Sequence, residues 1–275
     1  MRLTATSVPQ RLLTLRTRLD TIRLAMPNLT IELRGPAAWL TLQRPAIDAA
    51  FIGELHSACA PIGDDPEARA VVLTGSSDVF CSGWDESLKR DLGALRLTGV
   101  LDDPFGCLAT LPKPVICAIN GEATSGGLAL ALAADIRIAA EGARFALPEA
   151  TDGALPIAGG TQRLVRLIGH AKALEMILTG DPIDATEALR VGLVSEVVPE
   201  GKLAARAQEI AQRLAERGPV ALQFAKEAIS RGIDMTLEQA LRFETDLTVI
   251  LQTTEDRAEG VQAFREKRKP KFKGK

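Results

Sequence analysis

Apolar and polar residues alternate along two short segments near the start of the chain, residues 28–34 and 38–42. This alternation is typical of strands that bury one face, and the glycine and proline between the segments predict that they pair like a β-hairpin. Continuous apolar runs follow at residues 70–73 and 115–119. Such runs are typical of strands buried on both faces, so we expect these two strands inside a sheet.

Helical spacing of apolar residues alternates with these strands. Apolar side chains three and four positions apart in residues 46–60 predict a helix that ends before Pro61. Further elements are expected as helices at residues 85–96, 97–111 and 128–134, and as short strands at residues 135–139 and 144–147. Beyond residue 159 we expect helices at 161–168, 171–178 and 185–191, a short strand at 193–198, and three long helices up to residue 269.

The change from mixed strands and helices to helices alone, near residue 200, is the boundary that this pattern defines. We expect a core at residues 28–200 and a C-terminal helical region at residues 201–275. Residues 1–27 differ from both, because they are rich in arginine, serine and threonine, hold a single acidic residue and carry one apolar helical face. They can form an N-terminal arm or a targeting segment, or they can precede a translation start at Met26.

Composition indicates a globular protein, since 46% of the residues are hydrophobic and 25% are charged. The 33 basic and 35 acidic residues nearly cancel, which gives no electrostatic reason to expect nucleic acid as a partner. No apolar run is long enough to cross a bilayer, so no membrane partner is expected. The four cysteines form no CxxC pair, and we expect neither a metal site nor a disulfide framework. The expected location is the cytoplasm, or an organelle matrix if residues 1–26 are a transit peptide.

Two glycine turns are the candidate chemical features of the chain. Residues 121–127 follow one apolar strand and precede a helix, and residues 81–85 follow another strand. If neighbouring strands bring both turns to the same edge, two backbone N–H groups can converge on one carbonyl oxygen. Preorganised donors of this kind stabilise the negative charge that develops on oxygen in acyl chemistry. A turn chosen only for packing is the alternative, and we interpret Cys81, which has no neighbouring base, as a packing residue.

Several segments in the same order resemble the signatures of one enzyme family. They are residues 79–85, 119–128, 134–136, 145–149 and 159–164, with further similar segments at 178–180, 188–194 and 266–272. On these segments the chain from residue 28 onward resembles the enoyl-CoA hydratase/isomerase family, the crotonase superfamily. The resemblance implies an α/β fold, a crotonase-type spiral of ββα units with a C-terminal helical trimerisation region. It also implies an acyl-CoA thioester substrate and assembly as a homotrimer or a dimer of trimers, with coenzyme A as part of the substrate and no separate cofactor.

The resemblance also assigns roles to single residues. It implies that the backbone N–H groups of Trp84 and Gly126 form an oxyanion hole for the thioester carbonyl, and that Glu149 is the catalytic acid/base. The substrate-binding residues that it implies are Trp84, Asp85, Ser125, Gly126 and Gly127. The most informative departure from the family is Ala129, which replaces the first of two catalytic acids and carries no proton that it could transfer.

A single glutamate can serve several reactions. We expect hydration or dehydration of an enoyl-CoA, or isomerisation of its double bond. The alternatives are a specialised crotonase reaction on a branched or cyclic acyl-CoA, and a CoA-binding scaffold with little turnover. From the residues alone, Glu149 can equally pair with a helix N-terminus or with Arg163. We interpret Asp152 as a cap or a solvated loop residue, and the resemblance makes the basic residues after position 264 candidate partners of the CoA phosphates.

Overall fold

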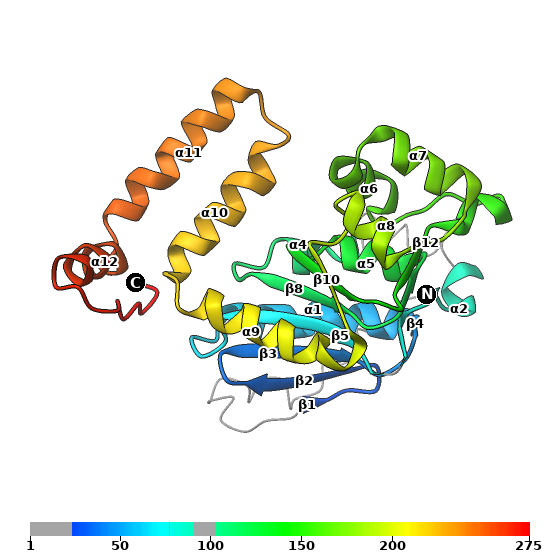
Figure 1. Cartoon of the computed structure of the whole chain (residues 1–275), viewed down its shortest axis with the longest axis horizontal. Helices are drawn as coiled ribbons and strands as arrows, with labels where there is room; N and C mark the ends of the chain where they lie inside the picture. Colours follow the sequence, from blue (N-terminus) through cyan, green and yellow to red (C-terminus); the bar gives the residue numbers. More distant parts are fainter. Residues whose placement is uncertain (1–23, 77, 91–102) are drawn as a thin grey trace, which may run out of the picture.

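The computed structural model of the protein describes residues 24–76, 78–90 and 103–275, and its largest element is a seven-stranded sheet (Figure 1). In order across the sheet, the strands are β1 (Leu24–Ala25), β2 (Leu29–Arg34), β3 (Ala37–Leu42), β5 (Ala70–Gly75), β8 (Val115–Ile119), β10 (Ile136–Ala140) and β13 (Glu196–Val198). Most of the predicted N-terminal arm, residues 1–23, lies outside the described residues.

The first strands confirm the predicted hairpin. β2 and β3 pair antiparallel, with Ile31 opposite Leu40. From β3 onward the neighbouring strands are parallel, in the order β3, β5, β8, β10 and β13. Every residue of β8 is buried, as its continuous apolar run predicted. Parallel strands need crossover connections, and these crossovers carry the rest of the core.

A second sheet of four strands is built from the crossovers. Its strands are, in order, β12 (Ile183–Asp184), β11 (Arg144–Ala146), β9 (Glu122–Thr124) and β6 (Val79–Cys81). Along the chain β6 follows β5, β9 follows β8 and β11 follows β10, so the chain alternates between the two sheets and winds as the expected spiral. β9 corrects the predicted turn at residues 121–127, and β6 is a strand that the sequence pattern did not predict. Strands of three residues are too short to show an alternating pattern.

The helices around the sheets agree with the predicted spacing, although their ends differ. They are α1 (Ala49–Asp64), α5 (Gly126–Leu132), α6 (Gly160–Ile168), α7 (His170–Thr179) and α8 (Ala185–Arg190), with the 3-10 helices η2 (Pro148–Asp152) and η3 (Glu200–Lys202). α1 begins later than expected because the Asp48 carboxylate caps it by accepting the Phe51 amide, and it continues through Pro61. The predicted helices at 85–96 and 97–111 correspond to α2 (Glu86–Arg90) and α4 (Gly106–Ala109), and residues 91–102 lie outside the described residues.

Four helices follow residue 200, where three were expected. They are α9 (Leu203–Ala215), α10 (Pro219–Gly232), α11 (Leu237–Gln252) and α12 (Glu255–Arg265). The break before α12 was missed because it contains two threonines and neither glycine nor proline; Thr254 caps the new helix by accepting the Arg257 amide. α9 packs on the large sheet, where the Trp39 indole donates to the Gln208 side chain at 2.7 Å.

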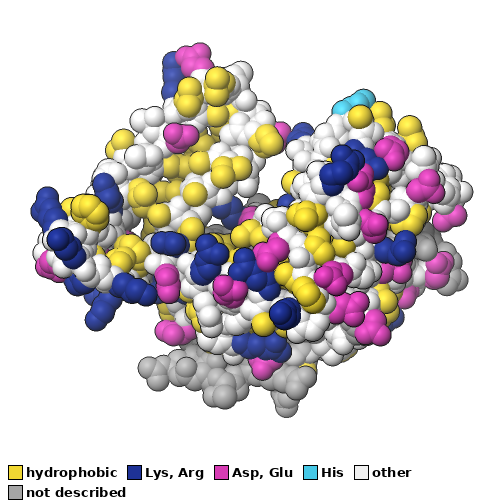
Figure 2. All heavy atoms as spheres, viewed as in Figure 1, with side chains coloured by type: hydrophobic (Ala, Val, Ile, Leu, Met, Phe, Trp, Pro, Cys, Tyr) yellow, Lys and Arg dark blue, Asp and Glu magenta, His cyan; other side chains and the backbone are white. Residues whose placement is uncertain are grey.

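α10 and α11 form an antiparallel pair that projects from the core (Figure 1). No residue of α10 is buried, and Leu247 is the only buried residue of α11. Hydrophobic side chains are visible over both helices in Figure 2. The most exposed are Ile229, Ile233, Leu237, Leu241, Val249 and Ile250.

A partly buried ion pair connects α10 to the core. The Lys226 ammonium of α10 lies 2.8 Å from the Asp135 carboxylate, which also accepts the Val115 amide at 2.7 Å. Burial raises the pKa of Asp135, and Lys226 opposes that rise. Among the described residues, no helix combines the length and the apolar character that crossing a membrane requires.

Candidate active site

The two predicted glycine turns meet at the start of α5. One turn lies in β7 (Gly83–Trp84), which pairs in parallel with β4 (Ala46–Ile47), and the other is the junction of Ser125 and Gly126. A Cβ added at Gly83 would lie 2.6 Å from the Ser125 Cβ, and a Cβ added at Gly126 would lie 2.6 Å from the Trp84 ring. Glycine at both positions therefore allows the turns to come into contact.

Trp84 is held in place from two sides. Its side chain is 7% exposed, and its ring stacks on Phe105 with 5.8 Å between the ring centroids and 5° between the ring planes. Phe105 is fully buried, and Gly126 contacts the indole from α5. Gly126 is the first residue of α5, so its N–H has no partner within the helix. A Cβ added at the next residue, Gly127, would overlap the Cys81 carbonyl, so α5 lies directly against β6 at this point.

Glu149 lies beside the same junction. It is in the first turn of η2, directly after Pro148, and its Oε1 accepts the Ser125 hydroxyl proton at 2.8 Å. Its second oxygen, Oε2, is buried and has no hydrogen-bond partner among the described residues. Arg163, the alternative partner suggested by the sequence, instead donates to Asp103 at 2.7 Å. The carboxylate therefore has one oxygen that the Ser125 hydroxyl holds and one without a partner in the described part of the chain.

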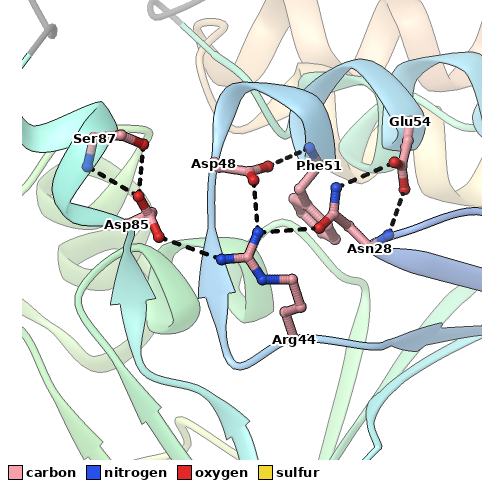
Figure 3. Close-up of polar contacts among 7 residues, drawn as sticks. All are labelled: Asn28, Arg44, Asp48, Phe51, Glu54, Asp85 and Ser87. Atoms are coloured by element: carbon pink, nitrogen blue, oxygen red, sulfur yellow. Dashed lines mark hydrogen bonds and ion pairs between the residues drawn. The ribbon is translucent and has the colours of Figure 1, made fainter.

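Arg44 connects the Trp84 turn to the start of α1 (Figure 3). Its guanidinium lies 2.9 Å from the Asp48 carboxylate and 3.4 Å from the Asp85 carboxylate. Asp85 also accepts hydrogen bonds from the Ser87 amide at 2.9 Å and from the Ser87 hydroxyl at 2.6 Å. The Asp85 side chain thus holds the backbone directly after Trp84 in place.

Other candidate residues have structural surroundings. Cys81 is fully buried, and burial raises the pKa of its thiol to about 12, which agrees with the packing interpretation. Asp152 is exposed at the end of η2. Ala129 is buried in α5 with 1% of its surface exposed, so it adds apolar surface. Glu122 is exposed and accepts the Thr124 hydroxyl at 2.6 Å.

The basic C-terminal residues lie far from this site within one chain. Figure 1 shows α12 and the C-terminus at the end of the molecule opposite to α2 and β4. Part of the charge is already neutralised, since Arg268 pairs with Glu266 at 2.6 Å and with Glu259 at 2.5 Å. In the ranges that the structure describes, no three histidine, cysteine or acidic side chains are grouped to hold a metal ion.

Sequence reasoning missed three features of the site. Arg44 was not predicted as a site residue, although its spacing to Asp48 is the i,i+4 spacing of a helical ion pair. The stacking of Phe105 on Trp84 had no signal in the sequence. The hydrogen bond from Ser125 to Glu149 joins residues 24 positions apart, and only the spiral brings them together.

Comparisons with known proteins agree with the resemblance. A family model described as "Enoyl-CoA hydratase/isomerase" matches residues 34–275. A probable enoyl-CoA hydratase of Rhizobium meliloti (strain 1021) is 41% identical over 253 residues, covering 90% of this chain and 98% of the relative. The short-chain-enoyl-CoA hydratase of Clostridium acetobutylicum is 40% identical, covering 88% of this chain and 96% of the relative. The crystal structure of an enoyl-CoA hydratase from Bacillus anthracis is 40% identical and superposes with a TM-score of 0.86, covering 90% of this chain and 100% of that chain.

Proposed function

The chain belongs to the enoyl-CoA hydratase/isomerase family, and from this premise we propose that it hydrates an enoyl-CoA thioester, or moves its double bond, with Glu149 as the single acid/base. We prefer hydration to isomerisation as the proposed activity because the relatives described above are named as hydratases. The observation that carries the proposal is that the two turns contact each other and that Glu149 lies beside them, with one carboxylate oxygen hydrogen-bonded and the other without a partner among the described residues.

The thioester oxygen is the proposed ligand of the two turns. The Trp84 and Gly126 N–H groups donate to that oxygen, and Asp85, Ser125 and Gly127 complete the substrate-binding segments. The contact between Gly126 and the indole supports this role, because it fixes one turn against the other before substrate arrives. Donors that are held in advance stabilise the developing enolate without reorganisation, which is their advantage over water.

Glu149 moves one proton at a time in both reactions. In hydration, Oε2 accepts a proton from water as the water oxygen bonds to C3, and the double-bond electrons move to the thioester oxygen. The enolate collapses as Glu149 returns the proton to C2. In isomerisation of a 3-enoyl thioester, Glu149 removes a proton from C2 and returns it to C4. A single carboxylate is sufficient for either sequence, so Ala129 does not prevent turnover.

We also propose that the protein assembles as a homotrimer or a dimer of trimers. The support is the exposed apolar surface of α10 and α11, which the chain's own core leaves uncovered. Helices of this length are only marginally stable alone in water, so a partner that covers their apolar face stabilises them. The family resemblance implies that the partner covering this apolar face is another copy of the same chain.

A reducing compartment such as the cytoplasm is proposed as the location. The support is that all four cysteines are free thiols, and three of them are buried. Cytosolic reductants keep thiols in this form. Labelling of intact cells followed by fractionation tests the proposal.

The test of the proposed function is a pair of assays on Glu149→Gln and the wild type. Hydration of 2-trans-enoyl-CoA and isomerisation of 3-enoyl-CoA are measured with short, branched and cyclic acyl groups. We expect kcat of the variant to fall by about 10²–10⁴, the range for a lost general acid/base. The matched control is Glu122→Gln, which removes the charge of an exposed glutamate in β9, three residues before Ser125, and its activity should match that of the wild type.

Three outcomes separate the hypotheses. Turnover that collapses in Glu149→Gln alone supports the mechanism, and the preferred substrate distinguishes hydration from isomerisation. Turnover that survives in Glu149→Gln rejects Glu149 as the acid/base. A wild type that binds CoA thioesters without turning over any of these substrates favours the scaffold or a specialised reaction.

A further inference from the structure

Ser125 has a backbone conformation that only glycine adopts without strain. Its φ is 54° and its ψ is −126°, and among the described residues it is one of three other than glycine with positive φ. Ser125 is buried, with 8% of its surface exposed, so this strained backbone conformation is not that of an exposed surface loop. Strain of this kind persists only where the surrounding structure enforces it, and it is concentrated at functional sites.

The side chain of Ser125 does not serve the helix that follows. Ser125 is the N-cap residue of α5, yet its hydroxyl makes no capping hydrogen bond. The hydroxyl donates instead to Glu149 Oε1 at 2.8 Å. The side chain also needs space that only glycine at position 83 provides, since a Cβ there would lie 2.6 Å from the Ser125 Cβ. Serine at this position is therefore explained by its contact with Glu149.

We propose that Ser125 is a positioning residue for Glu149. Because the hydroxyl proton occupies Oε1, the carboxylate plane is fixed and Oε2, which is buried without a protein partner in the described part of the chain, becomes the oxygen that exchanges protons. Ser125 is also bonded directly to Gly126, so a single peptide unit links the acid/base to the proposed donor for the thioester oxygen. This inference rests on the proposed function, since it takes Glu149 as the acid/base.

Two substitutions at Ser125 separate positioning from packing. Ser125→Ala removes the hydroxyl and keeps the Cβ, whereas Ser125→Gly removes the hydroxyl and relieves the backbone strain. We expect both variants to lose about 10- to 100-fold in kcat for hydration of a four-carbon 2-trans-enoyl-CoA, with KM within about threefold of the wild type, since the lost interaction acts on the reacting group. We expect Ser125→Gly to unfold at the same temperature as the wild type or higher.

The combination of unchanged or raised stability and lowered kcat in Ser125→Gly is the diagnostic result, because a merely structural residue loses activity only together with stability. The matched control is Thr124→Val, which deletes the neighbouring hydroxyl that donates to the exposed Glu122, and its kcat should equal that of the wild type. Glu149→Gln is measured in the same series. If it retains turnover, the proposed function itself is wrong. If it collapses while both Ser125 variants keep kcat within threefold of the wild type, the role of Ser125 alone is overturned.

Discussion

Replacing Gly126 by alanine tests whether the contact between the two turns is as tight as the structure describes. The added Cβ would lie 2.6, 2.7 and 3.0 Å from three atoms of the Trp84 ring. Carbon atoms in favourable contact are about 3.5–4.0 Å apart, so the overlap is close to 1 Å. The backbone at Gly126 has no positive φ, so alanine brings no backbone strain and the effect is steric.

The packing around the Trp84 indole leaves it little space to move away from an added Cβ. It is 7% exposed and stacks on Phe105, which is itself fully buried. Overpacking of this kind typically destabilises a protein by about 1–3 kcal/mol, and we expect a value near the upper end for Gly126→Ala. Any shift of Trp84 also moves its N–H, and loss of one oxyanion donor lowers kcat by about 10²–10³.

The matched control is Gly53→Ala, in the exposed middle of α1. A Cβ at Gly53 would meet no atom within 4 Å. Alanine in a helix interior is more favourable than glycine by about 0.5–1 kcal/mol, so this variant should be slightly more stable and fully active. Urea unfolding followed by circular dichroism gives the stabilities, and initial rates with a 2-trans-enoyl-CoA give the activity. If Gly126→Ala is as stable as the wild type and keeps kcat/KM within threefold, the contact between Gly126 and the Trp84 ring does not position the proposed site.

Three further changes test other parts of the structure. Lys226→Met should lower the free energy of unfolding at pH 7 by about 2–4 kcal/mol, because it leaves the Asp135 carboxylate without its cation. Burial already raises the pKa of Asp135, and loss of Lys226 raises that pKa further. A carboxyl whose pKa is higher in the folded state binds its proton more tightly there, so the penalty grows as pH rises through the interval between the unfolded and folded pKa. Urea midpoints should therefore fall less at pH 5 than at pH 7, and an equal fall would contradict the assignment. Arg44→Ala should cost about 1 kcal/mol or less, and less at high salt, because the Arg44 side chain is 46% exposed; a loss above about 3 kcal/mol would show that the network is stronger than a surface ion pair. Leu237→Asp, on an exposed apolar position of α11, should reduce the sedimenting mass towards that of a monomer, whereas the neighbouring Glu238→Gln should not; an unchanged mass in both variants would place the interface elsewhere.

The sequence predicted those parts of the fold whose signals are local. The hairpin of β2 and β3 follows from alternation within fifteen residues, and β8 follows from an uninterrupted apolar run. β6 and β9 could not be predicted in this way, because each has three residues and is defined by its pairing with other strands of the small sheet. The start of α12 depends on the Thr254 cap, which no periodicity marks.

The same distinction applies to the site. The two glycine turns are visible in the sequence, the family resemblance singled out Trp84 and Gly126 within them, and the structure brings these turns into contact. The partners of the site residues were not visible. Arg44 lies 41 positions from Asp85, and Ser125 lies 24 positions from Glu149. These side chains meet because successive turns of the spiral stack on one another, and that stacking is a property of the whole chain.

The spiral also distributes the proposed chemistry over three successive turns. β6 leads to Gly83 and Trp84, β9 leads to Ser125 and Gly126, and β11 leads to Glu149. Each group thus has its own strand as a support, and the supports touch one another where Gly126 meets the Trp84 ring and where Ser125 donates to Glu149. In the proposed site a proton-transfer group can be lost independently of the oxyanion donor, since Ala129 stands three residues after Gly126 in the same helix, α5. Such independence allows one scaffold to acquire new acyl-thioester reactions by single replacements.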